Sequence, residues 1–209
     1  MPDSQWKVMV ELLKDKGIRF TEGLTSAEIS QIQDKFRFVF PDDLRDFLQT
    51  ALPVSDHFPN WRTESDETLQ ARLDTPLHGL LFDLEHNDIW MPSWGPRPTD
   101  KDAACDVVRG LVQSAPSLIP VYSHRMMPDR PQASGNPVYS VHQTDIIYYG
   151  INLRDYLIHE FLIDTDIAFW PIPDSIRQIE FWDIMEMQSV RWDDDGQGIV
   201  FDNRDGTLP

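Results

Sequence analysis

Two histidines and one aspartate form the group in this sequence that is best suited to chemistry. His124 and His142 each follow a short apolar run typical of a β-strand, and Asp145 stands three residues beyond His142. If those strands pair, the two imidazoles and the carboxylate could converge to bind a metal ion or to carry out acid–base chemistry. Arg125 directly follows His124, however, and its positive charge opposes a bound cation. We therefore predict a binding role for these four residues, without a metal ion and without a catalytic residue.

A simpler interpretation is that the histidine side chains hydrogen-bond the neighbouring loop and hold its backbone in place. Residues 124–137 are rich in proline and glycine, which predicts an ordered loop of irregular backbone. Within it, Asn136 precedes Pro137 and is therefore biased toward extended conformations. We include Asn136 among the predicted binding residues and expect its side chain to hydrogen-bond the loop.

Three tryptophans are candidate anchors for a protein partner. Trp61, Trp90 and Trp94 stand in segments rich in proline and glycine, where loops are expected. An exposed tryptophan in an ordered loop is a frequent interface anchor. By contrast, we expect Tyr148 and Tyr149 to belong to the core, because aromatic side chains on half-buried strands usually do.

The common motifs of nucleotide, hydrolase and metalloprotease sites are missing from the sequence. It contains no Gly-x-Gly-x-x-Gly, no Walker loop, no Gly-x-Ser-x-Gly and no His-Glu-x-x-His. The single cysteine, Cys105, precedes Asp106, whose charge disfavours a reactive thiolate, so we expect a small buried hydrophobe. Residues 193–196 resemble part of a calcium loop, but the EF-hand register places Arg191 at the first ligand position. We expect neither a cofactor nor a metal.

The elements that would position these residues begin with a helical N-terminal half. Apolar residues recur at helical spacing from Trp6 onward, and Thr25 and Glu28 have the spacing of a capping box. Pro41 suits the first position of a short helix. Two further helices are predicted, one over 67–84 with an interruption near Pro76 and one over 100–112.

The middle third is predicted to form β-strands over 118–123, 138–142 and 145–149. The link between the last two is only Gln143 and Thr144, which is not the Asn-Gly type that favours a tight primed turn. We expect these strands to supply much of the core through Val121, Val138, Val141, Ile146 and Ile147.

Two more helices are predicted after the strands, one capped by Asn152 and one over about 174–188. The simplest assembly is a single α+β domain with a central, mainly antiparallel or mixed sheet, N-terminal helices and covering helices. We place this domain at residues 1–190. Residues 191–209 are predicted to be an acidic tail or an edge hairpin through Gly198.

Carboxylates outnumber basic side chains about two to one. The 209 residues include 18 Lys and Arg against 35 Asp and Glu, which gives a formal net charge of −17. This balance argues against nucleic acid as a partner, because phosphates are held by clustered basic side chains. The same charge would attract a basic partner, or it would only keep the protein soluble. No apolar run is long enough to span a membrane and the N-terminus lacks a signal pattern, so we expect a cytoplasmic protein.

Two segments resemble the bacterial Smi/Knr-like proteins of the SUKH superfamily. They are residues 118–125 (LIPVYSHR) and 135–150 (GNPVYSVHQTDIIYYG). The opening from Gly23 through the Phe40-Pro41 step is similar in kind, and so is Trp94 followed by a helix. The resemblance covers roughly residues 23–161, and the Trp- and Met-rich segment and acidic end beyond it depart from a minimal member.

The resemblance implies a single α+β domain with a central sheet and a role in protein binding. Many bacterial members are immunity proteins that bind and neutralise a toxin, often a nuclease, and the fungal relatives are regulators linked to cell-wall synthesis. No catalytic residue is carried over. We therefore expect a non-enzymatic protein-binding module of the immunity type with a basic toxin as its partner. Two alternatives stay open: a general regulatory protein like the fungal relatives, and a small-ligand binder or enzyme around His124, His142 and Asp145.

Overall fold

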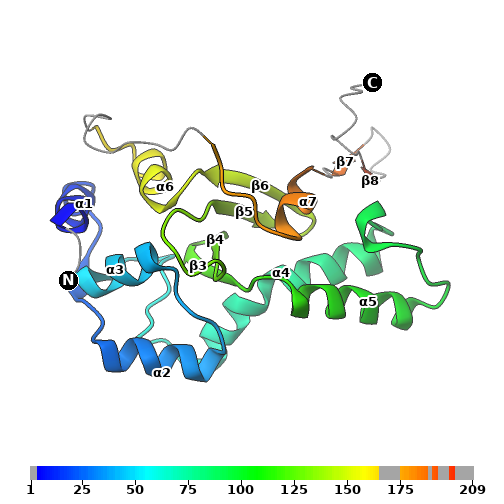
Figure 1. Cartoon of the computed structure of the whole chain (residues 1–209), viewed down its shortest axis with the longest axis horizontal. Helices are drawn as coiled ribbons and strands as arrows, with labels where there is room; N and C mark the ends of the chain where they lie inside the picture. The colour runs from blue at the N-terminus through cyan, green and yellow to red at the C-terminus, as the bar shows by residue number, and fades with distance from the viewer. Residues whose placement is uncertain (1–3, 165–174, 188–189, 193–197, 201–209) are drawn as a thin grey trace.

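The computed structural model describes residues 4–164, 175–187, 190–192 and 198–200. At its centre lies a four-stranded antiparallel sheet in the order β3-β4-β5-β6, with helices against both faces (Figure 1). The strands are consecutive in the chain and form a meander, with these bounds: β3 (Leu118–Tyr122), β4 (Arg125–Pro128), β5 (Val138–His142) and β6 (Asp145–Gly150). The predicted α+β fold in a single domain is confirmed.

Two-residue turns join β3 to β4 and β5 to β6. Ser123 and Gln143 adopt φ of 51° and 55°, and His142 pairs directly with Asp145. The link at Gln143 is therefore a tight turn although it lacks glycine. Strand β4 corrects the sequence analysis, which predicted only irregular loop over 124–137. All prolines and glycines of that segment come after residue 127, so nothing in its first residues prevents them from pairing with the neighbouring strands.

The N-terminal half consists of α1 (Ser4–Asp15), α2 (Ser26–Phe36) and α3 (Asp42–Thr50), with a small sheet of β1 (Phe20–Glu22) and β2 (Ala51–Pro53). The predicted capping box is confirmed at the start of α2. The Glu28 N–H donates to Thr25 Oγ1 at 3.2 Å, and the Thr25 N–H donates to Glu28 Oε2 at 2.8 Å. Pro41 is the N-cap of α3 and not its first helical residue.

Two long helices, α4 (Asp66–His86) and α5 (Lys101–Ser114), lie side by side and project away from the N-terminal helices (Figure 1). The predicted interruption of α4 at Pro76 is wrong. Pro76 is buried and the helix continues through it, because packing of its apolar face outweighs the one hydrogen bond that a proline cannot make. A short 3₁₀ turn, η1 (Pro92–Trp94), lies in the connection between the two helices.

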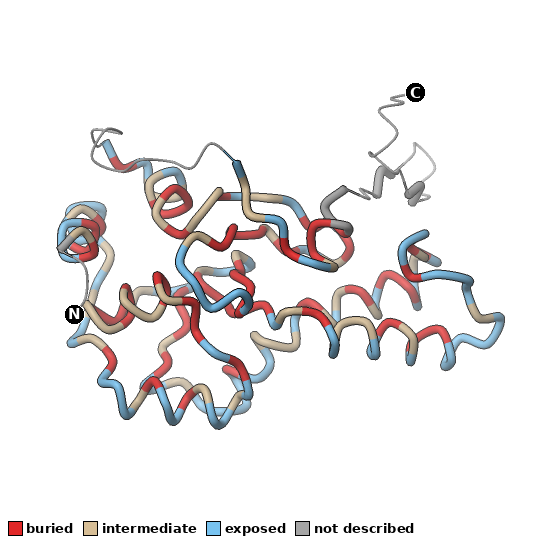
Figure 2. Tube along the Cα trace, in the orientation of Figure 1, coloured by how far each residue is buried: buried red, intermediate tan, exposed pale blue. Residues whose placement is uncertain are grey.

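The sheet separates two hydrophobic cores. Neighbouring residues of one strand point to opposite faces, so Met127 joins the core formed with α1, α2, α3 and α6, while Met126 joins the core formed with α4, α5 and α7. On β5, Val138 likewise joins the first core and Tyr139 the second. Buried residues consequently occur along the strands and in the helices that pack against them (Figure 2). The predicted core residues Val121, Val138, Val141 and Ile146 are all buried.

After the sheet follow α6 (Leu153–Glu160) and α7 (Trp182–Met187). Asn152 caps α6 as predicted, but the last helix is shorter than the predicted 174–188, because residues 175–181 are not helical. Helix α7 is held on the sheet by Asp183, which accepts hydrogen bonds from the hydroxyls of Tyr139 at 2.6 Å and Tyr148 at 2.5 Å.

Beyond α7, β7 (Val190–Trp192) pairs antiparallel with β8 (Gly198–Val200), as in the hairpin alternative for the C-terminal end. The calcium-loop resemblance at 193–196 and the end of the chain from residue 201 lie outside the described residues. Within the described part of the chain, no helix has the length and apolar character needed to cross a membrane.

Candidate functional site

Part of one sheet face is left uncovered next to α6. Arg125, Ser140 and Ile147 lie in register across β4, β5 and β6, and Tyr149 follows two residues after Ile147 on the same side. Ile147 is 41 % exposed and Tyr149 39 %. We call this surface, with His142, the open half-face. It corrects two core expectations of the sequence analysis, because Ile147 and Tyr149 reach the solvent.

Arg125 lies beside Tyr149 in the open half-face and is held from several sides. Its guanidinium lies 3.5 Å from the centroid of the Tyr149 ring, a cation–π contact. Its Nη1 donates to Ser140 Oγ at 2.6 Å and to His124 Nε2, and its Nε donates to Glu160 Oε2 at 3.3 Å. The ion pair with Glu160 is mostly shielded, with side-chain exposures of 12 % and 19 %. Arg125 is thus a fixed cation that organises the surface.

A buried phenol lies beneath this ion pair. Tyr156 of α6 is fully buried, and its hydroxyl has no hydrogen-bond partner in the described part of the chain. Burial, reinforced by the charge of Glu160, raises the pKa of Tyr156 far above its usual range. Helix α6 approaches the sheet closely at Tyr156, and Gly150 makes room for it. A Cβ added at Gly150 would lie 2.5 Å from the Cβ of Tyr156. The hydroxyl therefore stays protonated at every physiological pH.

The histidines and the aspartate of the sequence analysis are only partly brought together. His142 stands opposite Asp145 at the end of the β5–β6 hairpin, and the His124 carbonyl accepts from the Val141 N–H at 3.0 Å. Burial, followed by the charges of Arg125 and His142, lowers the pKa of His124 below its usual value. Among the described residues, no three His, Cys, Asp or Glu side chains are arranged to hold a metal ion.

Asn136 does not belong to an accessible surface. It is fully buried, and its Nδ2 donates to the carbonyls of Pro128 at 2.9 Å and Pro131 at 2.8 Å. Its Oδ1 accepts from Arg177 Nη1 at 2.7 Å. The expectation that it hydrogen-bonds the loop is confirmed, whereas a direct contact with a partner is contradicted because the side chain is buried and both of its polar atoms are hydrogen-bonded inside the protein.

The tryptophan anchors are also largely buried. Trp61 is 6 % exposed and Trp94 is 5 % exposed, so the expectation of exposed anchors is wrong for both. Trp90 is half-buried, and its Nε1 donates to the Gly95 carbonyl at 2.8 Å. The indoles pack against other aromatic rings and not outward: Trp90 is edge-on to Trp94 at 5.3 Å, and Trp61 is edge-on to Phe40 at 5.4 Å.

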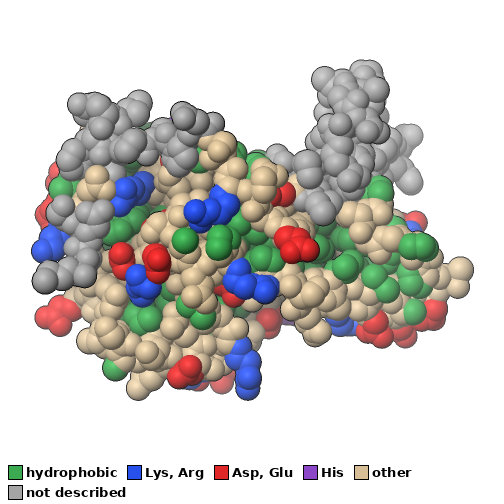
Figure 3. Space-filling model, viewed as in Figure 1, with side chains coloured by type: hydrophobic (Ala, Val, Ile, Leu, Met, Phe, Trp, Pro, Cys, Tyr) green, Lys and Arg blue, Asp and Glu red, His purple; other side chains and the backbone are tan. Residues whose placement is uncertain are grey.

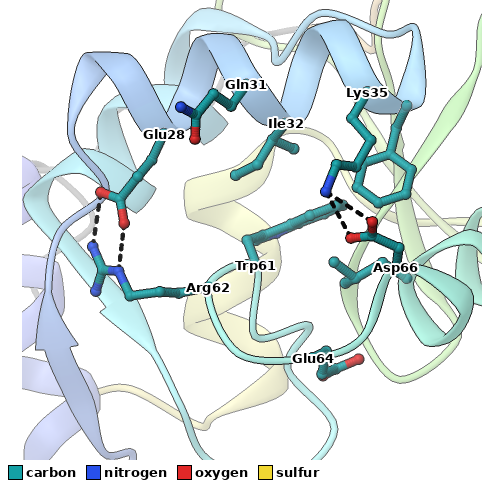
Figure 4. A pocket seen from close by; sticks show the side chains of 10 residues that line it. Glu28, Gln31, Ile32, Lys35, Trp61, Arg62, Glu64 and Asp66 are labelled. Atoms are coloured by element: carbon teal, nitrogen blue, oxygen red, sulfur yellow. Dashed lines mark hydrogen bonds and ion pairs between the residues drawn. The ribbon is translucent and has the colours of Figure 1, made fainter.

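A hollow of about 230 Å³ lies between α2 and the start of α4 (Figure 4). An ion pair stands at each end of it, Arg62 with Glu28 at 2.6 Å and Lys35 with Asp66 at 2.8 Å. The Trp61 ring lies between the two pairs, below Gln31 and Ile32 (Figure 4). Hydrogen bonding to Arg62 lowers the pKa of Glu28 to about 2. In each pair the positive and the negative charge are already bound to each other, so this hollow offers a ligand few free charges.

A second hollow of about 270 Å³ begins on the other side of Phe36, which lines both. Its walls come from α4, the end of α5, the start of β3 and Trp182 of α7. Most of the residues that line it are apolar, and among the described residues of the lining Asp74 is the one that is acidic. None of these residues was expected to bind anything, and Pro76 was expected only to interrupt a helix, because they are ordinary helix and strand positions whose shared hollow depends on tertiary packing.

The comparisons with known proteins leave the family open. No protein-family model matches the chain, and no curated protein and no solved structure is significantly similar to it. The function must therefore be argued from the residues and their arrangement.

Proposed function

We propose that this chain is a non-enzymatic protein-binding module of the immunity type, which neutralises a basic toxin by covering it. The observation that carries this proposal is the open half-face, where Ile147 and Tyr149 are exposed on a rigid sheet and surrounded by polar side chains. Specific interfaces have this anatomy of an apolar centre within a polar rim. Arg125 and Glu160 are paired with each other there, which suits a pre-organised contact surface better than a reactive centre.

The distribution of charge supports a basic partner. Residues 66–114, which contain α4 and α5, carry nine carboxylates and only four basic side chains. Carboxylates gather over α5 in the space-filling view (Figure 3). The four basic side chains are already engaged: Arg72 with Glu64, Arg97 with Asp88, Lys101 with the carbonyl of Glu85, and Arg109 with Asp106. The excess negative potential would speed association with a cationic protein such as a nuclease.

The resemblance to the SUKH superfamily supports the same proposal, since the segments that carry it, 118–125 and 135–150, include strands β5 and β6 and Arg125 of the open half-face. The regulatory alternative predicts several weak partners and no toxin gene beside this one, so adjacent reading frames distinguish the two. The enzyme alternative has less support, because His124 Nε2 accepts from Arg125 and His124 Nδ1 lies 3.3 Å from the Ser123 hydroxyl, so both ring nitrogens have a neighbour inside the protein.

The test is affinity purification from the native host with the wild-type protein and two variants. Ile147→Asp places a charge at the centre of the open half-face, and Val8→Asp makes the same change at a residue of α1 that is 42 % exposed. We expect one stoichiometric, basic partner whose binding weakens with salt, about tenfold or more with Ile147→Asp and unchanged with Val8→Asp. Equal binding by all three proteins, or no partner at low salt, would contradict the proposal.

A further inference from the structure

The second hollow lies where the two cores of the molecule meet. Leu73 packs against the core of the N-terminal helices, whereas Leu77, Val112 and Trp182 pack against the core of α4, α5 and α7. Trp182 is fixed further by its Nε1, which donates to the Pro116 carbonyl at 2.7 Å. The walls are therefore held in place before any ligand arrives, and preformed apolar hollows bind at low entropic cost.

The size of this hollow limits what can fill it. At about 270 Å³ it falls below the range of roughly 300–1,000 Å³ that is usual for pockets of cofactors and drug-sized ligands. An aliphatic or aromatic side chain of a bound protein is a better match. The hollow is then a socket for one residue of a larger partner.

Asp74 indicates what stands beside that residue. Its carboxylate accepts a hydrogen bond from Gln70 Nε2 at 2.9 Å, and it has no basic partner in the described part of the chain. The carboxylates of the neighbouring hollow differ, because Glu28, Glu64 and Asp66 are each paired with a lysine or arginine. A half-buried carboxylate beside an apolar socket is complementary to a cation.

We propose that the second hollow receives an apolar side chain of the basic protein partner and that Asp74 pairs with a lysine or arginine next to it. This inference rests on the proposed protein-binding function and names a second contact surface for it, separate from the open half-face. The recognised segment has the composition of an aliphatic or aromatic residue flanked by basic residues.

The test uses three defined peptides with blocked ends: Lys-Leu-Lys, Lys-Gly-Lys and Glu-Leu-Glu. Each is titrated into the ¹⁵N-labelled full chain, and the Trp182 indole N–H signal is followed by NMR. We expect Lys-Leu-Lys to shift this signal saturably and the other two peptides to leave it in place. Asp74→Asn should weaken the binding of Lys-Leu-Lys three- to fivefold, which matches the loss of one partly exposed ion pair of up to about 1 kcal/mol.

The matched control is Asp102→Asn, which removes the same charge from an exposed position on α5. If both variants bind Lys-Leu-Lys equally weakly, the effect of Asp74→Asn is only general electrostatic attraction, and the inference is overturned. It is also overturned if Lys-Gly-Lys binds as well as Lys-Leu-Lys, or if only the indole signals of other tryptophans shift. The native partner separates this inference from the proposed function. If Ile147→Asp weakens binding of that partner and Asp74→Asn does not, the hollow is excluded and the function stands. If Lys-Leu-Lys fills the hollow and no partner is found, the hollow is still a site for an apolar residue flanked by basic residues, but the proposed function fails.

Discussion

Asp43 is a carboxylate that the fold buries in order to hold a distant loop. It lies in the first turn of α3 and is 6 % exposed. Its Oδ2 accepts from the Gly135 N–H at 2.8 Å, and its Oδ1 accepts from the Leu44 N–H at 3.0 Å. Burial nevertheless outweighs these hydrogen bonds and the charge of Arg154, and it raises the pKa of Asp43 to about 6. The stability of the protein is therefore linked to pH at this residue.

The sign of this linkage gives a prediction. Because the pKa in the folded state lies above the usual 3.8, the contribution of Asp43 to stability is full below 3.8 and is lost as the pH rises through about 6. Between pH 5 and 7.5, we expect the wild type to lose about 1.4 kcal/mol of unfolding free energy relative to Asp43→Asn. Urea unfolding of both proteins at several pH values measures this difference. A constant difference across the range would show that Asp43 does not titrate there.

Asn136 gives a second prediction, because its amide cannot be replaced even by a residue of the same shape. Asn136→Asp turns a donor that serves two carbonyls into an oxygen that repels them. We expect a loss of about 2–4 kcal/mol in unfolding free energy at neutral pH. Urea unfolding measures the loss, and Gln132→Glu is the control, since it makes the same change at an exposed residue of the same loop. A similar loss in both variants would contradict the role of the buried hydrogen bonds.

Residue types were easier to predict than residue environments. The sequence supported a hydrogen-bonding role for Asn136 and a small buried side chain at Cys105, and the structure agrees. It could not place Trp61 and Trp94, because composition shows that a segment is a loop but not that the loop folds over its own indole. It also could not separate Ile146 from Ile147, since adjacent apolar residues alternate between a packed face and an open one.

At the scale of elements, the contact between α4 and the β5–β6 hairpin fixes the position of the sheet. Thr144 donates from its N–H at 2.9 Å and from its hydroxyl at 2.5 Å to Asp83, which is 1 % exposed. One turn earlier on α4, Gly79 allows the hairpin backbone to approach. A Cβ at Gly79 would lie 2.7 Å from the Cα of Gln143.

Two glycines in neighbouring helices should therefore respond to alanine with opposite signs. Alanine normally stabilises a helix interior by about 1 kcal/mol relative to glycine. Gly110→Ala in α5 should show most of this gain, because in the described part of the chain no heavy atom beyond the neighbouring backbone of α5 itself lies within 4 Å of the new Cβ. Gly79→Ala should instead destabilise by about 1–3 kcal/mol, since it pushes against backbone. Thermal unfolding of both variants measures the signs, and stabilisation by Gly79→Ala would mean that the hairpin is not packed as described.

Most elements were predictable from spacing and capping residues, and the failures have identifiable causes. The capping box at Thr25, the hairpin strands and the Asn152 cap follow from local chemistry. The continuity of α4 through Pro76 depends on packing that no local rule contains. Strand β4 was missed because only four residues form it, within a segment otherwise rich in turn formers.

The whole molecule is organised around a sheet that both cores share. Met126 and Met127 are adjacent in β4, 2 % and 0 % exposed, and each belongs to a different core. A strand of four residues cannot unfold on one face alone. The two cores should therefore unfold together although their apolar residues scarcely mix.

Because both cores share the sheet, a destabilising substitution in either core should lower the free energy of unfolding of the entire protein. Met126→Ala and Met127→Ala should each cost about 2–5 kcal/mol. In both variants, unfolding followed by tryptophan fluorescence should coincide with unfolding followed by far-UV circular dichroism, as for a two-state protein. Two separate transitions in Met126→Ala, with one core surviving the other, would contradict the shared sheet as the unit of stability.

The same arrangement has a consequence for the order of synthesis. Trp6 and Phe47 are buried in a core that also contains Ile119 and Val138, which are translated much later. Asp43 likewise cannot form its hydrogen bond to Gly135 until the chain has grown by 92 residues. At roughly 5–20 residues per second, the ribosome needs on the order of ten seconds to bridge that distance. During this interval the nascent N-terminal helices display their apolar stripes with nothing to cover them. We expect yield in the cell to depend on chaperones that bind the growing chain before the meander emerges.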